Sequence, residues 1–373
     1  MKDVVLVGCG YVADLYMRSF DVMTDMRVTG AHDRDPERLR AFCARWDLRP
    51  LPDMDAVKEA GHKGALALNL TNPAAHVAVS RELLDAGLHV WSEKPMTLSM
   101  DDARALHALA AAKGVHLASA PSSVLSEAAQ ALGRALRAGI AGRPVVAYAE
   151  MDDGFIPQAP YRLWRSESGA PWPAGDEFRT GATLEHAGYW LSWLIALFGP
   201  VRTVVAASAE LVPGKEGVEG VPDFSVATLF FHSGMVARLT CSIAAPVDRR
   251  LRVVGETGTL TVPEAWDNAT RVKFRRRLVL RRRLIESPLA RRVVVSANPH
   301  PHVAPKGAAA MNFALGPHEM LDAIAAGRTP RLAGDYALHL TEVTLAIHNA
   351  GEGAGAQAMS TRCEVMEPMP WAL

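Results

Sequence analysis

The segment VVLVGCGYVA at residues 4–13 determines how the first part of this chain folds. Its four apolar residues form a run typical of a short buried strand, and helical character begins at Tyr11. The GxGxxA pattern between such a strand and helix fits a dinucleotide-binding turn. The first glycine allows a tight turn, the second lets a pyrophosphate approach the backbone, and free N–H groups at the helix start favour phosphates. We therefore expect a dinucleotide to bind at Gly8, Cys9, Gly10, Tyr11, Val12 and Ala13.

The alternation of strand and helix continues beyond this turn. Further apolar strands are expected at 26–31, 65–70, 90–91 and 115–118, with helices between them. This rhythm predicts an α/β fold with a doubly wound parallel sheet, a Rossmann domain, over residues 1–121. Such sheets bind ligands outside the carboxyl ends of their strands. The residues expected at these ends are Gly8, Asp33, Thr71 and Glu93.

Asp33 bears on the identity of the cofactor. It ends the second expected strand, roughly 20 residues after the glycine turn, where a carboxylate can accept hydrogen bonds from the adenosine ribose. A carboxylate there also repels a 2′-phosphate, which favours NAD. The neighbouring Arg34 could instead bind that phosphate, so NADP stays open.

The rhythm changes after a helix expected at 127–138. Five strands joined by short connections then predict an antiparallel sheet, within a second domain over residues 122–350. A last helix at about 335–349 is expected to pack back on the body. Residues 351–373, rich in Gly and Ala, are expected to form a loosely ordered tail. The five strands are expected at 145–151, 202–211, 224–231, 236–243 and 251–262.

The composition fits a folded protein of a reducing compartment. The 373 residues include 40 Lys plus Arg and 40 Asp plus Glu, so the formal net charge is zero and provides no field to attract nucleic acid or a membrane. The four cysteines are scattered, without metal-ligand spacing, and no apolar segment reaches the ~18 residues of a membrane helix. We expect a cytoplasmic protein with a small-molecule substrate and no metal, nucleic-acid partner or membrane partner.

The tetrapeptide Ser92-Glu93-Lys94-Pro95 is a second chemical signal. A lysine at a strand end beside a nicotinamide ring can be partly desolvated, and burial would lower its pKa towards the working pH. The fixed backbone of Pro95 would direct that lysine. A solvent-facing loop lysine is the alternative interpretation.

Together these motifs resemble the Gfo/Idh/MocA oxidoreductases, a family named for glucose–fructose oxidoreductase, inositol dehydrogenase and a rhizopine-catabolism protein. The resemblance extends over nearly the whole chain, from Val4 to about Ala350. The matching segments are GCGYVA at 8–13, Asp33, TNP at 71–73 with His76, EKP at 93–95, GIAGRP at 139–144 and GETGTL at 255–260.

The resemblance implies a second domain of α/β type with a large, open-faced sheet. In this family the sheet commonly forms an oligomer interface, which here implies a homodimer or homotetramer. It also implies that Lys94 contributes to proton transfer beside the nicotinamide. Cofactor contacts are then expected from Arg34, Thr71, Asn72, Pro73, His76, Glu93 and Lys94.

Relatives carry an Asp on a helix and, four residues later, a His, both aimed at the substrate. In this chain Glu185 and Tyr189 stand at those positions, and their i, i+4 spacing puts them on one helix face. A register shift of one would bring His186 to the site in place of Glu185. The proton could thus be transferred by Lys94, Tyr189 or His186, while Glu185, His186 and Tyr189 bind the substrate. Two tryptophans of the same helix are expected to pack in the core, Trp190 and Trp193.

Residues 154–178 form a long segment broken by Gly and Pro and rich in aromatic side chains. Segments of this length without regular structure are commonly lids or binding loops. Flat aromatic faces beside guanidinium groups suit a polyhydroxylated ring or a carboxylate. We therefore expect Arg162, Trp164 and Trp172 to contact the substrate. Packing against a partner subunit is the alternative.

Residues 271–292 hold ten Arg or Lys and a single acid, Glu286. A site for a phosphorylated substrate or for nucleic acid is one interpretation of this basic tract. The basic residues alternate with apolar ones, which favours a solvated sheet face or an interface.

These observations predict an NAD(P)-dependent dehydrogenase or reductase. The reaction would move hydride between nicotinamide and a secondary alcohol or ketone. By resemblance, the substrate would be a sugar, a cyclitol or a similar polar ring. Three alternatives remain: an imine or conjugated-carbonyl reductase of natural-product metabolism, NAD-dependent glycoside cleavage, and a non-catalytic dinucleotide sensor.

Overall fold

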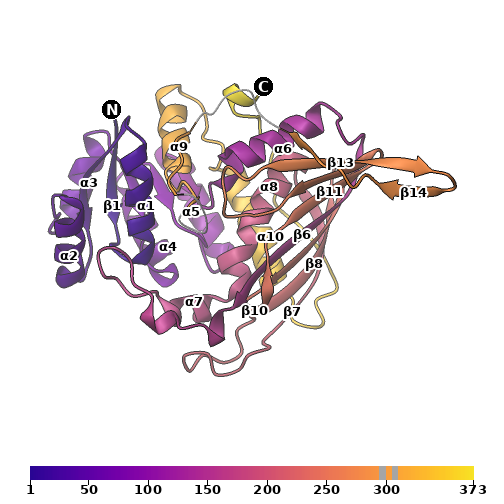
Figure 1. Cartoon of the computed structure of the whole chain (residues 1–373). Helices are drawn as coiled ribbons and strands as arrows, with labels where there is room; N and C mark the ends of the chain where they lie inside the picture. Colours follow the sequence, from indigo (N-terminus) through magenta and orange to yellow (C-terminus); the bar gives the residue numbers. More distant parts are fainter. Residues whose placement is uncertain (294–299, 305–309) are drawn as a thin grey trace.

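The computed structural model contains two sheets and describes residues 1–293, 300–304 and 310–373 (Figure 1). The first sheet has five parallel strands in the order β2-β1-β3-β4-β5, which confirms the doubly wound Rossmann domain. Its strands are β1 (Lys2–Val7), β2 (Met26–His32), β3 (Leu66–Asn69), β4 (Val90–Ser92) and β5 (Leu117–Ser119), and its helices are α1 (Tyr11–Val22), α2 (Pro36–Trp46), α3 (Met54–His62), α4 (His76–Asp85) and α5 (Met100–Lys113).

Local sequence explains these elements. The consecutive residues Val4, Val5 and Leu6 are all fully buried, because helices cover both faces of a parallel sheet. Helix α2 begins where the Asp35 carboxylate accepts the N–H groups of Glu37 and Arg38, and Pro36 occupies its first turn. Helix α3 was not expected from the sequence.

The second sheet has eleven strands and is open on one side. Its main order is β14-β13-β12-β11-β6-β9-β8-β7-β16, with β10 paired to β6 and β15 to β13. All its pairs are antiparallel except β6–β9. Helices α6 (Glu127–Arg137), α8 (Gly188–Phe198) and α10 (Asp335–His348) lie along one face (Figure 1). The strands are β6 (Pro144–Phe155), β7 (Val201–Ala209), β8 (Phe224–Phe231), β9 (Val236–Ser242), β10 (Ala244–Asp248), β11 (Leu251–Gly255), β12 (Gly258–Val262), β13 (Val272–Leu280), β14 (Arg283–Glu286), β15 (Arg291–Val293) and β16 (Ala356–Ala358).

Two sequence expectations for this domain are wrong. Residues 251–262 form a hairpin of two strands, because the chain turns at Glu256 and Thr257. The tail is held to the body: β16 pairs with β7, and Arg331 donates hydrogen bonds to two backbone carbonyls of the tail. A helix that the sequence did not indicate, α9 (Leu315–Ala325), packs its Gly316 against Trp91 of the Rossmann domain.

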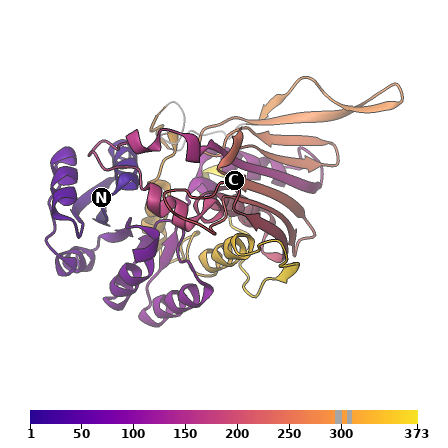
Figure 2. The same ribbon diagram turned by 90° about the horizontal axis from the view of Figure 1, so that it is seen from below.

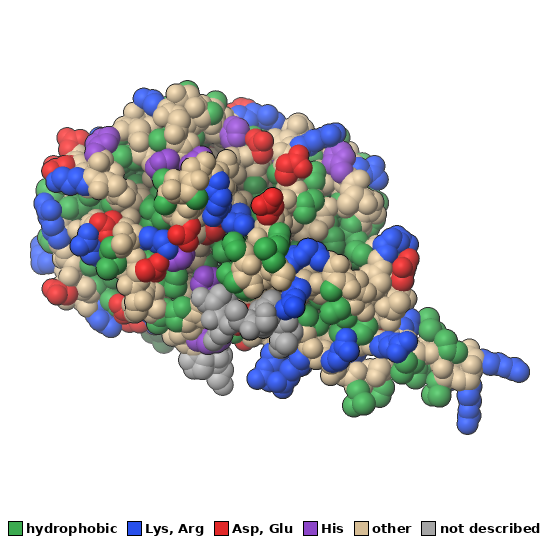
Figure 3. All heavy atoms as spheres, turned by 90° about the horizontal axis from the view of Figure 1, so that it is seen from above, with side chains coloured by type: hydrophobic (Ala, Val, Ile, Leu, Met, Phe, Trp, Pro, Cys, Tyr) green, Lys and Arg blue, Asp and Glu red, His purple; other side chains and the backbone are tan. Residues whose placement is uncertain are grey.

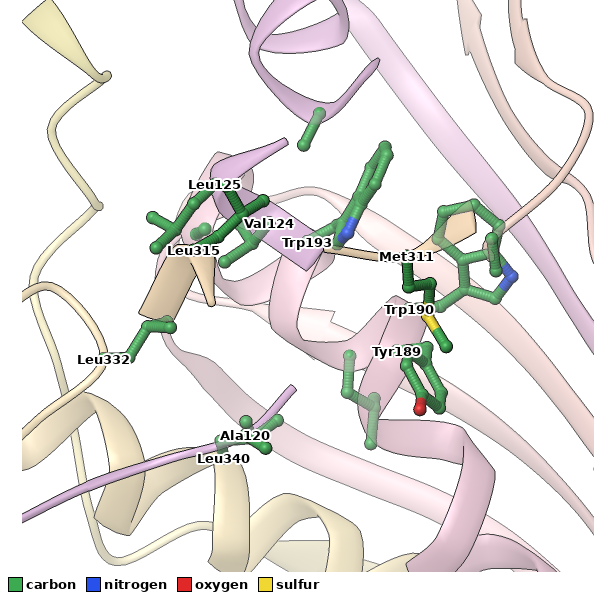
Figure 4. Packing of buried hydrophobic residues seen from close by; sticks show 14 of the residues in the cluster. Ala120, Val124, Leu125, Tyr189, Trp190, Trp193, Met311, Leu315, Leu332 and Leu340 are labelled. Atoms are coloured by element: carbon green, nitrogen blue, oxygen red, sulfur yellow. The ribbon is translucent and has the colours of Figure 1, made fainter. Parts of the chain in front are cut away.

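The predicted packing of Trp190 and Trp193 in the core is confirmed (Figure 4). Their rings meet edge-on with centroids 5.0 Å apart, and their indole N–H groups donate to Glu150 O and Ser123 Oγ. Seen from below, the two domains lie side by side (Figure 2). In the described residues, every cysteine is a buried free thiol, and no helix is long and apolar enough to cross a membrane.

Candidate active site

The glycine turn lies where the carboxyl ends of β1 and β3 meet. Gly8 has a φ of +100°, and a Cβ there would lie 2.6 Å from the Leu70 backbone, so this position requires glycine. Gly10 caps α1 without a side-chain hydrogen bond from any described residue, and a Cβ on it would meet nothing within 4 Å. The first turn of α1 therefore offers N–H groups and open space, which fit a pyrophosphate. In the same turn Ala13 is fully buried, whereas Tyr11 and Val12 are half-buried.

Asp33 is fixed beside this turn. Its two carboxylate oxygens accept the N–H groups of Cys9 and Asp35, each at 2.8 Å. The Cys9 thiol is buried, so this residue faces the site through its backbone. Arg34 is exposed, and Arg38 lies 3.6 Å from the Asp33 carboxylate. Arg38 thus joins Arg34 as a guanidinium group near Asp33, and the sequence had indicated only Arg34.

The segment after β3 lies next to the glycine turn, since Gly8 packs against Leu70 and Thr71. The Thr71 hydroxyl donates to Asn69 at 2.6 Å, and Asn72 donates to Asp176 at 3.4 Å, while Pro73 begins a short 3₁₀ helix. His76 is buried, with Nδ1 2.7 Å from the carbonyl oxygen of Pro95 and Nε2 2.9 Å from that of Thr71. Its buried ring therefore joins the loop after β3 to the loop after β4.

Lys94 follows β4, and its ammonium pairs with the Glu185 carboxylate. The preceding Glu93 is buried and accepts the Tyr16 hydroxyl at 2.7 Å and the Lys94 backbone N–H at 3.0 Å. Burial by itself would lower the pKa of Lys94, but the nearby carboxylates, Glu185 first, outweigh burial and raise this pKa well above its ordinary value. The expectation of a lowered lysine pKa is therefore wrong, because the buried ion pair favours the charged amine.

Glu185 and Tyr189 reach Lys94 from a single helical segment. A π-helical turn, Thr183–Ala187, leads into α8, and such turns are frequent at functional sites. Tyr189 lines a small pocket together with Lys94 and Glu93. Burial, opposed by Lys94, raises the pKa of the Tyr189 hydroxyl above its ordinary value of 10. The phenol is therefore protonated at neutral pH and can donate a hydrogen bond into the pocket.

His186 lies next to the ion pair and does not replace Glu185 in it. Its ring centroid is 6.1 Å from that of Trp266. Burial, followed by the charges of Lys94 and Arg249, lowers the pKa of His186 to about 3. The imidazole is therefore neutral over the physiological range. Of the two registers that the sequence left open, the structure has the one with Glu185 at Lys94.

Two acidic residues of this site were missed. Glu177 lies on α7 (Ala174–Thr180), and burial, followed by the charge of Glu185, raises its pKa to about 8. Burial also raises the pKa of Asp153 to about 6, although Arg249 donates a hydrogen bond to it at 2.7 Å. Glu177 was overlooked because its segment was expected to be irregular. The adjacent Asp152 and Asp153 within an apolar strand were a usable signal.

Residues 156–173, here named the strap, cross from the second domain to α1 (Figure 1). The Ser168 hydroxyl donates to Asp14 at 2.7 Å, and Glu167 pairs with Arg18. Both partners lie on the helix that begins at the glycine turn. The strap is therefore attached to the element that would hold the dinucleotide phosphates.

The aromatic residues of this segment pack against one another. The ring centroids of Trp164 and Trp172 are 5.3 Å apart, and Tyr161 lies 5.5 Å from Trp172. Arg162 is exposed and pairs with Glu216 at 3.0 Å. Arg162 and Trp172 line a separate pocket of about 370 Å³. The structure thus does not bring Arg162, Trp164 and Trp172 into the pocket of Lys94.

Comparison with known proteins agrees with this arrangement. The model of the GFO_IDH_MocA oxidoreductase family, NAD-binding Rossmann fold, matches residues 2–120, and that of the GFO/IDH/MocA C-terminal domain matches residues 129–261. The chain belongs to the Gfo/Idh/MocA family. The resemblance found in the sequence is confirmed. The first sheet belongs to the NAD-binding Rossmann domain of this family.

Individual relatives show how far this similarity extends. D-apiose dehydrogenase of Paraburkholderia graminis is 28% identical over 266 residues, which cover 68% of this chain and 66% of that enzyme, slightly less than two thirds of its length. UDP-N-acetylglucosamine 3-dehydrogenase of Acidithiobacillus ferrooxidans matches over 94% of this chain and 98% of its own, with a TM-score of 0.70 and 21% identity. The Bordetella pertussis dehydrogenase WlbA, solved with NADH and UDP-GlcNAcA, has a TM-score of 0.70, 19% identity, and coverage of 96% and 97%. These two structures share the fold with this Gfo/Idh/MocA chain.

Proposed function

We propose that this protein is an NAD(P)-dependent oxidoreductase. It transfers hydride between nicotinamide and a secondary alcohol or ketone of a sugar, a cyclitol or a similar polar ring. The observation that carries the proposal is the Lys94–Glu185 pair beside Tyr189, at the carboxyl edge of an NAD-binding sheet. Relatives that are named as sugar dehydrogenases support the substrate class.

The dinucleotide would rest on the first turn of α1 and against Asp33. When bound, its nicotinamide supplies or accepts the hydride. Side chains of the protein must donate or accept a proton, because oxidation of an alcohol releases one from the hydroxyl and reduction of a ketone consumes one. We propose that Lys94 transfers this proton to or from the substrate oxygen.

In the direction of reduction, the Lys94 ammonium donates its proton to the substrate oxygen while Tyr189 donates a hydrogen bond to the same oxygen. In the direction of oxidation, the Lys94 ammonium first passes a proton to the paired Glu185 carboxylate, and the resulting amine accepts the hydroxyl proton. Glu185 keeps Lys94 in place, whereas Glu177, whose pKa is raised to about 8, already holds a proton at neutral pH. Neutral His186 would serve as a hydrogen-bonding partner for substrate hydroxyls.

The test compares the wild type with Lys94→Met. Cofactor binding is measured by energy transfer from tryptophan to NADH and to NADPH, and turnover is measured by nicotinamide absorbance with a panel of polyols, sugars and nucleotide sugars. Loss of a general acid–base group should lower kcat by about 100-fold or more and leave the Kd for the reduced cofactor within a few-fold. The surface variant Lys63→Met should match the wild type. Equal turnover in the Lys94 variant would remove the assignment, and failure of the wild type to bind either cofactor would remove the proposal.

Three finer statements belong to the same proposal. NAD is preferred over NADP, because Asp33 would repel a 2′-phosphate, although Arg34 and Arg38 stand close by. The protein works in the cytoplasm, where its four buried thiols stay reduced. It assembles as a homodimer or homotetramer through the open face of the eleven-stranded sheet. Tighter binding of NADPH than of NADH would contradict the first statement, and a monomer in sedimentation would contradict the third.

A further inference from the structure

The basic tract ends in a β-ribbon that projects from the molecule, residues 277–286, here named the arm (Figures 1 and 3). Strand β13 last pairs with β12 at Arg276, and beyond it β13 pairs only with β14 among the described residues. The Ser287 N–H donates to the Arg276 carbonyl at 2.8 Å and closes the base of the ribbon. The arm is therefore two strands wide and has no third strand beside it.

Apolar side chains occupy both faces of the arm. In its register Leu278 pairs with Ile285, and Val279 pairs with Leu284. Successive residues of a strand point to opposite faces, so one apolar pair lies on each face. Val279 is 75% exposed, Leu284 64% and Leu278 40%. An isolated two-stranded ribbon is marginally stable in water, so apolar side chains exposed on both of its faces favour a partner that covers them.

Charge indicates what covers the arm. The tract 271–292 carries ten basic residues and one acid, a net charge of +9. Because the whole chain has 40 basic and 40 acidic residues, the remainder has 30 basic and 39 acidic ones, a net charge of −9. The remainder of a second copy therefore has a net charge opposite to that of the tract that carries the arm. An anionic membrane is a poorer partner, because it would repel the remainder of the chain.

We propose that the arm docks on a second copy of this chain. Its apolar pairs lie against the partner's surface, while Arg281, Arg282 and Arg283 at its tip lie among the partner's carboxylates. This contact is separate from the reaction proposed above, and the experiments on it need no substrate.

The first experiment uses the full chain with Val279→Cys. All four native cysteines are buried, so a benzophenone maleimide should label the new thiol selectively. Irradiation should give a species of twice the chain mass, and mixing ¹⁵N-labelled with unlabelled protein should give hybrid cross-linked peptides that join one copy to another. Cross-links confined to one copy, or none, would overturn the proposal.

The second experiment removes the arm by joining Arg276 to Ser287 through Asn-Gly, a turn suited to a two-residue hairpin. Loss of several buried apolar anchors should raise the Kd for self-association about 100-fold in sedimentation, and the double variant Val279→Ser/Leu284→Ser should weaken it in the same direction. NADH binding reports that both variants are folded. An unchanged Kd would overturn the proposal. Arm-dependent binding to phosphatidylserine vesicles without self-association would overturn it in favour of a membrane.

Discussion

Replacing Glu177 by glutamine should change how the stability of this protein depends on pH. The carboxyl group lies beside Glu185 and Lys94, and its pKa is raised from 4.5 to about 8. The folded state therefore holds a proton between these two values that the unfolded chain releases. The free energy of unfolding must then fall as the pH rises through this window.

The structure also bounds the size of the effect. At about 1.36 kcal/mol per pH unit, a rise of the pKa from 4.5 to about 8 corresponds to at most about 5 kcal/mol for an isolated group. The charges of Glu185 and Lys94 readjust when Glu177 ionises, so we expect less than this bound, about 2 kcal/mol. Glutamine stays neutral at every pH. Glu177→Gln should therefore match the wild type near about pH 5 and exceed its stability by about 2 kcal/mol near about pH 8.

The assay is urea unfolding followed by tryptophan fluorescence, which the eight tryptophans make sensitive. The quantity of interest is the difference between variant and wild type, because other buried acids such as Asp152 and Asp153 titrate in the same window in both proteins. Asp176→Asn, at the adjacent position of α7, is the matched control. A difference that does not vary with pH, or a wild type that is the more stable protein near pH 8, would refute the reasoning.

Three further perturbations test other parts of the structure. Glu185→Gln leaves Lys94 buried without its carboxylate partner, so its pKa should fall and the alkaline limb of kcat/KM should move down by about two pH units. Arg18→Ala removes one attachment of the strap to α1, and NADH release in stopped flow should become about fivefold faster, as expected for an ion pair worth up to about 1 kcal/mol. Gly316→Ala would place a Cβ 1.9 Å from the buried Trp91 ring, and the free energy of unfolding should fall by about 3 kcal/mol.

Each of these three variants has a control variant or an outcome that would contradict the prediction. Gly353→Ala adds a Cβ that meets nothing within 4 Å, so it should be neutral; equal losses in both glycine variants would contradict the packing argument. Arg45→Ala removes a different surface arginine and should leave NADH release unchanged. For Glu185→Gln, an alkaline limb at the wild-type pH would mean that Lys94 does not control it.

Short contiguous stretches of sequence were sufficient to predict the Rossmann domain and the edge of its sheet at which a cofactor is expected. The glycine turn, the EKP triplet and Asp33 were each predicted because a strand end, a turn and a helix start follow one another within a few residues. The side-chain requirements there are also local: Gly8 needs a positive φ, and α2 begins at a capping aspartate. The burial of the two tryptophans of α8 was predicted because indoles on an apolar helix usually fill volume in the core.

The sequence failed where a residue's role depends on a distant part of the chain. Lys94 and Glu185 are 91 positions apart, and their contact is the largest of the charge interactions that reverse the effect of burial on the pKa of the lysine. Glu177 acquires its raised pKa from the same cluster. Trp164 and Trp172, predicted to contact the substrate, pack on each other outside the pocket of Lys94, and Trp172 also packs on Tyr161.

By itself, then, the sequence determined the alternation of strands and helices in the Rossmann domain, the glycine turn and the family. The tertiary structure decided which carboxylates surround Lys94, where the aromatic residues of the strap pack, and that the basic tract projects as an arm. The physical reason is the distance along the chain between the residues that interact. Backbone conformation and helix caps depend on neighbours within a few residues, whereas burial and charge–charge interactions depend on side chains that only the folded chain brings within a few ångströms.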